Sequence, residues 1–84
     1  MTDEEMALFI EMTTAASLAA KATLTLSIAG KPVSANNAVR CITLSGWINS
    51  NSPHHDRLVL AVHTQVEEML AAAKNLSQLS FDRE

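Results

Sequence analysis

The sequence has few of the residues that are typical of disulfide-stabilised or disordered small proteins. It contains one cysteine, two glycines, two prolines, no tyrosine and only 4% aromatic residues. A single cysteine cannot form an internal disulfide, so the chain is not a disulfide scaffold. The low glycine and proline content excludes collagen-like chains. A hydrophobic content of 48% excludes intrinsic disorder and leaves one small globular domain.

Positive charge is also scarce. Six basic and nine acidic residues give a formal net charge of −3. Nucleic-acid-binding domains gather many cations on one face to neutralise phosphates, and this chain has too few for that. Arg40, with Asn36, Asn37 and Thr43 nearby in sequence, has the chemistry to contact base edges. A dimeric nucleic-acid-binding transcriptional regulator therefore stays as an alternative.

No segment has the pattern of a secretory signal or a membrane span. Residues 1–5 are acidic where a secretory signal would be basic. Residues 12–30 are long enough to cross a bilayer, but six of them are Ser or Thr. Lys21 near their centre would cost about 2.5–3.5 kcal/mol on insertion. Together with the unpaired Cys41, which suits a reducing compartment, these features predict a cytoplasmic protein without a membrane span.

Helix boundary signals divide the chain into three segments. Thr2 followed by Glu5 is a capping box, which begins a helix. Gly30 can take the left-handed conformation that ends one. Ser34 can cap a second helix, and Ser52 before a proline can begin a third. We therefore predict a single domain over 1–84, with helices at about 3–29, 35–49 and 53–79 and a flexible tail at 80–84.

Residues 22–28 permit a second interpretation. They read A-T-L-T-L-S-I, an alternation that is typical of a β-strand. Alanine-rich helical sequence runs directly into this segment, however, and no convincing second strand follows it. The helix is favoured, and a short strand over 22–28 remains open.

The helical segments predict an all-α fold. Short loops between helices favour antiparallel neighbours, so we expect two long antiparallel helices with a shorter middle helix, as a three-helix bundle or helical hairpin. The third segment has an apolar seam of Val59, Val62, Val66, Met69, Ala73 and Leu76, flanked by Leu58 and Leu70. The middle segment has a broad buried face of Ala38, Cys41, Ile42, Leu44, Ser45 and Ile48.

The first segment is apolar or small around most of its circumference. Its charges from Glu11 onward, Glu11 and Lys21, fall on one narrow row. One long and one short helix cannot cover the rest, and at about 25 cal/mol per Å² several hundred exposed Å² forgo several kcal/mol. A two-fold homodimer would bury this surface. The expected dimer interface consists of Phe9, Ile10, Ala16, Ala20, Leu24 and Ile28.

The candidate reactive residues do not form a catalytic or metal site. His54, His55 and His63 lack the spacing of four that places two ligands on one helical face. Cys41 is expected on a buried face, as a small hydrophobic residue. The sequence has neither a glycine-rich phosphate loop nor paired carboxylates. We therefore predict no enzyme activity, no catalytic residues, no metal and no cofactor.

Trp47 is the exception that suggests a binding surface. On the expected middle helix it falls among polar residues, with Asn36, Arg40 and Thr43. Tryptophan and arginine are strongly enriched at the energetic centres of protein interfaces. The alternative is that Trp47 fills a gap between the second and third helices. We interpret Trp47, Arg40, Thr43 and Asn36 as a surface for a partner protein.

These features are typical of small adaptor or inhibitor proteins, including those carried by phages and mobile elements. The similarity lies in small size, acidic net charge and the lack of a catalytic site, and it does not rest on any sequence motif. The predicted function is a non-enzymatic protein-binding regulator or inhibitor. Besides the nucleic-acid-binding regulator, a structural or assembly subunit is the second alternative.

Overall fold

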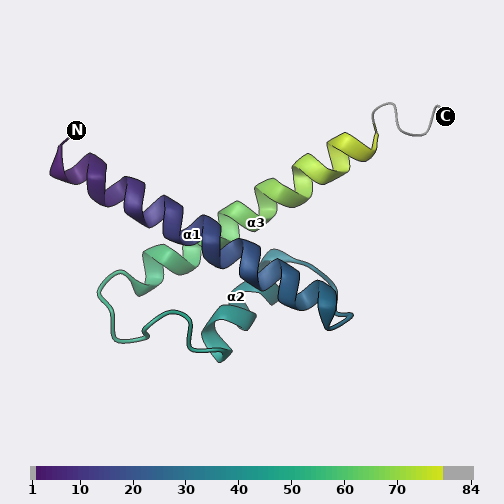
Figure 1. Ribbon diagram of the computed structural model, residues 1–84, viewed down its shortest axis with the longest axis horizontal. Helices are drawn as coiled ribbons and strands as arrows, with labels where there is room; N and C mark the ends of the chain where they lie inside the picture. Colours follow the sequence, from purple (N-terminus) through teal and green to yellow (C-terminus); the bar gives the residue numbers. More distant parts are fainter. Residues whose placement is uncertain (1, 79–84) are drawn as a thin grey trace.

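The computed structural model describes residues 2–78, which form three α-helices (Figure 1). Helix α1 spans Asp3–Ile28, α2 spans Ala35–Leu44 and α3 spans His55–Ser77. Within the described range there is no strand, so the all-α prediction is confirmed. Residues 22–28 belong to α1, and the alternative of a strand there is wrong. The predicted helix end at 79 and the tail at 80–84 lie outside the described residues.

Helix α1 has the boundaries that its sequence predicts. The Thr2 hydroxyl accepts a hydrogen bond from the Glu5 amide, and the Glu5 carboxylate accepts one from the Thr2 amide, both at 3.1 Å. At the other end Gly30 has a φ of +70°. The Lys31 amide donates to the Leu26 carbonyl at 2.9 Å, which completes a Schellman motif.

Helix α2 is five residues shorter than predicted, because a second Schellman motif ends it at Leu44 rather than at 49. Gly46 has a φ of +71°. The Trp47 amide donates to the Ile42 carbonyl at 3.1 Å. The glycine therefore reverses the backbone before Trp47, which lies outside the helix.

Helix α3 begins at His55, two residues later than predicted. The Ser52 hydroxyl accepts a hydrogen bond from the His54 amide at 3.2 Å, and the Ser52 carbonyl accepts one from the His55 amide at 3.1 Å. Ser52 thus closes a turn that leads into α3, and the residue at the N-cap is His54.

The two long helices cross near their middles, as Figure 1 shows, so the expected antiparallel side-by-side arrangement is wrong. All three helices contact one another. The α1 residues buried in these contacts include Ala15, Ala19 and Ala22, whose small side chains allow close approach of the neighbouring helices. Beyond the crossing, the N-terminal half of α1 and the C-terminal half of α3 diverge.

The core is small. Within residues 2–78 eleven hydrophobic residues are buried, and five of them are alanines. The others are Leu18, Leu26, Ile42, Ile48, Val62 and Val66. The helices therefore pack through alanines together with six larger aliphatic side chains.

The crossing also explains two errors in the predicted core. The α3 seam is buried at Val62 and Val66, but its second half, including Met69 and Leu76, is exposed because that half of α3 extends beyond α1. Leu44, predicted on the buried face of the middle helix, is 81% exposed at the end of α2. Large apolar side chains therefore remain on the surface.

Candidate protein-binding surfaces

More large apolar side chains lie on the surface than in the core. Among the described residues thirteen large hydrophobic residues are exposed, and only six residues larger than alanine are buried. Extended apolar patches on small proteins mark interaction sites. The exposed residues gather on the outer face of α1, at the diverging ends of α1 and α3, and at the end of α2.

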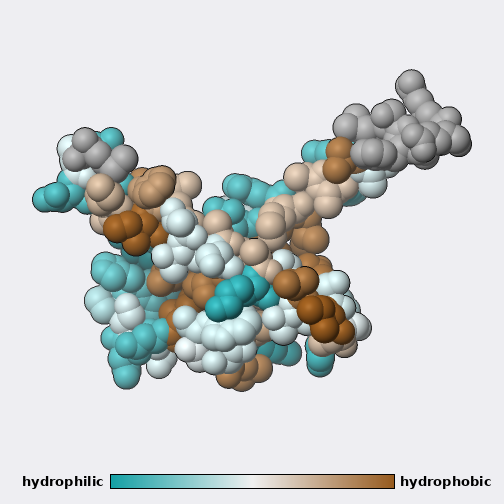
Figure 2. Space-filling view, in the orientation of Figure 1, coloured by the Kyte–Doolittle hydropathy of each residue, from teal (hydrophilic) through white to brown (hydrophobic). Residues whose placement is uncertain are grey.

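The outer face of α1 is apolar along its length. Phe9, Leu24 and Ile28 are 59%, 62% and 78% exposed. In Figure 2 hydrophobic colours lie near both ends of α1, the middle of the helix is paler, and its N-terminal tip is hydrophilic. We call this face the α1 stripe, and all six predicted dimer residues lie on it. The stripe consists of Met6, Phe9, Ile10, Thr13, Ala16, Ser17, Ala20, Leu24 and Ile28.

Two charges of α1 are held against the rest of the fold. A carboxylate oxygen of Glu11 lies 3.3 Å from a guanidinium nitrogen of Arg57 on α3, and the Glu11 side chain is 17% exposed. The Lys21 ammonium lies 4.7 Å from the centre of the Trp47 ring, a cation–π contact. Neither charge lies on the α1 stripe.

The exposed face of α2 brings together three of the four predicted partner-binding residues. Asn36, Arg40 and Thr43 are separated by four and three residues, and all three are exposed. Leu44 adds a large apolar side chain at the end of the helix. We call these four residues the α2 face.

The fourth predicted residue, Trp47, does not share this helical face as expected, because Gly46 ends α2 before it. Its ring contacts Lys21 of α1 and is 36% exposed. The side chain thus partly fills the junction between α1 and the end of α2, and partly remains available at the surface.

His63 joins α2 to α3. Its Nε2 lies 3.2 Å from the side-chain oxygen of Asn36, and its Nδ1 lies 3.2 Å from a carboxylate oxygen of Glu67. The Nε2 contact joins the α2 face to α3, and the Nδ1 contact lies within α3. In the described range no three His, Cys, Asp or Glu residues lie close enough to hold a metal ion.

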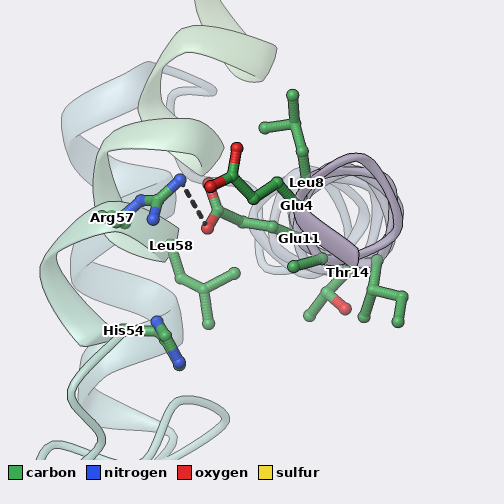
Figure 3. A pocket seen from close by; sticks show the side chains of 9 residues that line it. Glu4, Leu8, Glu11, Thr14, His54, Arg57 and Leu58 are labelled. Carbon is green, nitrogen blue, oxygen red and sulfur yellow. Dashed lines mark ion pairs between the residues drawn. The ribbon is translucent and has the colours of Figure 1, made fainter. Parts of the chain in front are cut away.

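A groove of about 650 Å³ lies between the N-terminal half of α1 and the start of α3 (Figure 3). The Glu11–Arg57 ion pair crosses from one helix to the other beside it. Helical periodicity does not predict this groove, because the groove depends on how the helices cross. Its lining includes Glu4, Leu8, Ile10, Glu11, His54, Arg57 and Leu58.

The residues considered for covalent chemistry are not assembled into a site. Cys41 is partly buried and packs against the hydrophobic core, on the side where the sequence placed it. The ring of His55 contacts its neighbour Asp56 at 3.0 Å, and His63 is engaged as described. What these surfaces offer a ligand is apolar area with a few charged groups, which suits binding of another protein.

Two further findings bear on function. No helix within residues 2–78 is long and apolar enough to cross a lipid bilayer. No family model, curated protein or solved structure matches the chain. Any function must therefore be inferred from the exposed surfaces themselves.

Proposed function

We propose that this protein is a small non-enzymatic regulator or inhibitor that acts by binding a partner protein through a helical surface. The observation that carries the proposal is that, within residues 2–78, thirteen large hydrophobic residues are exposed and only six residues larger than alanine are buried. Covering such a surface yields about 25 cal/mol per Å² of apolar area. Only another chain can supply that cover. The one thiol, Cys41, suits the reducing cytoplasm, where we place the protein.

The partner site is the α2 face together with Trp47. Arginine and tryptophan are enriched among residues that dominate binding energy, and this surface offers Arg40 and the exposed part of Trp47. Leu44, at 81% exposure, supplies an apolar side chain for a pocket on the partner. The contact with His63 restrains the Asn36 side chain, so this side chain loses little conformational entropy when the partner binds.

The working unit is a homodimer that pairs through the α1 stripe. Because α1 and α2 contact each other through their buried faces, their exposed faces point away from each other. The α1 stripe can then be covered by a second copy while the α2 face stays free for a partner.

The test is capture of a partner with matched variants. Tagged wild-type protein should enrich a specific protein, identified by mass spectrometry. Leu44→Glu should abolish that enrichment by burying a charge in the interface. Leu76→Glu, the same change at an exposed leucine on the far end of α3, should leave it intact. Equal capture by both variants, or no enriched protein with the wild type, would contradict the proposal.

Trp47→Ala gives a second test. If Trp47 contacts the partner, the variant should lose capture and keep its helical circular dichroism and its mass. If the variant unfolds, Trp47 belongs to the core and not to the partner site. A complex with generic DNA that weakens as salt rises would instead support the nucleic-acid-binding alternative.

A further inference from the structure

The N-terminal half of α1 is a helix without a core of its own. From Asp3 to Thr14 no residue is buried, and only Glu11 is half-buried. In Figure 1 this segment extends away from the crossing point. An isolated helix of about 12 residues is marginal in water. The segment therefore needs a cover that the rest of the described chain does not supply.

The uncovered side of this segment is part of the α1 stripe, whose pattern is that of a helix pair. Large apolar residues stand at both ends of the stripe and small ones in its middle. Small residues in the middle let two helices approach closely. The central positions alternate in steps of four and three, the repeat of paired helices: Met6, Ile10, Thr13, Ser17, Ala20 and Leu24.

We infer that the α1 stripe binds the same stripe of a second copy, antiparallel, with the two-fold axis near Thr13 and Ser17. This deepens the proposed homodimer and rests on it. Small residues then face small residues at the axis. Met6 of one copy lies beside Leu24 of the other. The two-fold axis repeats this contact at the opposite end of the stripe, as an isologous interface requires.

Charge favours the antiparallel orientation. A parallel pair would bring together two acidic first turns, each with Asp3, Glu4 and Glu5, and two helix N-termini. The antiparallel pair places each acidic turn near the end of the other copy's α1, where Lys31 follows the helix. Lys21 leaves the stripe uncharged because it lies over the Trp47 ring.

The size of the stripe sets the expected strength of the dimer. From Met6 to Ile28 the helix rises by about 33 Å, and a helix is about 10 Å wide. Contact over that strip buries on the order of 1,000 Å² in the two copies together, near the lower limit for a specific interface. The dissociation constant should accordingly be on the order of micromolar.

Single cysteines in a Cys41→Ser background test the orientation. Ser17→Cys, close to the axis, should form a disulfide-linked dimer on oxidation at tens of micromolar protein. Met6→Cys and Leu24→Cys should not link to themselves, because equal positions lie about 27 Å apart in the antiparallel pair. When these two variants are mixed they should link to each other. Ala72→Cys, exposed on α3, measures random linking.

Two outcomes would overturn the inference. Self-linking of all three stripe variants would show a parallel pair. Linking no greater than that of Ala72→Cys, with a sedimentation mass of 9.1 kDa at the same concentration, would show that the stripe does not bind a second copy. Neither result affects partner capture through the α2 face, since Leu44→Glu leaves the α1 stripe unchanged. If the wild-type protein forms the dimer but enriches no partner protein, the partner site alone is contradicted.

Discussion

The two faces of α1 carry opposite kinds of apolar side chain. The face against α2 and α3 is built largely from Ala15, Ala19 and Ala22, whereas the outer face carries Phe9 and Leu24 among its large residues. An ordinary surface helix buries its large apolar residues and exposes polar ones. Here three of the five buried α1 residues are alanines, which allow close approach of α2 and α3, and the large residues of the outer face are exposed.

The sharpest test of this comparison sets Ala19 against its neighbour Ala20. Ala19 is 1% exposed, so Ala19→Leu should force the helices apart and lower the free energy of unfolding by about 3 kcal/mol. Ala20→Leu adds the same atoms on the exposed side and should cost nothing in the single chain, when unfolding is measured at sub-micromolar protein, below the dissociation constant inferred for the dimer. Urea denaturation followed by circular dichroism measures both. Similar losses in the two variants would mean that the two faces do not differ in packing.

A second test addresses the outer face. Leu24→Glu places a charge in each half of the inferred dimer and should weaken self-association about 30-fold, equivalent to about 2 kcal/mol. Sedimentation velocity over a concentration series measures the change. Leu76→Glu is the matched control, because it removes a leucine that is also exposed but lies on α3. Should both variants associate alike, the α1 stripe would be ordinary exposed surface.

Local signals in the sequence predicted most of the helix boundaries. The Thr2–Glu5 capping box and Gly30 act through neighbouring backbone groups, and both lie where expected. The end of α2 was missed even though Gly46 plays the same part as Gly30. Only Gly30 has a proline two residues later to mark the stop. An isolated glycine within an apolar pattern was therefore interpreted as helical.

The crossing of α1 and α3 could not be predicted in the same way. Periodicity shows which residues share a helical face, and it predicted six of the nine residues of the α1 stripe. It does not show at what angle two faces meet. The exposure of Met69 and Leu76, the Glu11–Arg57 pair and the groove beside it all follow from that angle.

The Glu11–Arg57 pair should contribute less than either face of α1. Arg57 is 63% exposed, so Arg57→Ala should lower the free energy of unfolding by less than about 1 kcal/mol, and less again in high salt. The exchange of both charges, Glu11→Arg with Arg57→Glu, should restore most of the loss. Thermal unfolding at low and high salt measures the effect. A loss comparable with that of Ala19→Leu would show that an ion pair, and not alanine packing, fixes the crossing.

The smallest effect concerns the capped end of α1. Hydrogen bonds with the backbone amide and then the hydroxyl of Thr2 lower the pKa of Glu5. Because the pKa is lower in the folded protein than in the unfolded chain, ionised Glu5 stabilises the first turn above the unfolded pKa. This contribution is lost as the pH falls through the folded pKa. Titration of the Glu5 carboxyl by NMR should show the lowered pKa, and Thr2→Ala should raise it.

Amide hydrogen exchange in the same turn then distinguishes stabilisation by the cap from stabilisation by a second copy. If the α1 stripe is covered by a second copy, the protection of the turn, relative to the intrinsic exchange rate at each pH, should be high at high protein concentration and low in dilute, acidic solution. If exchange depends on pH but not on concentration, the cap alone holds the N-terminal half of α1 as a helix. In that case the large residues of the outer face would have no stabilising contact with a second copy to account for them.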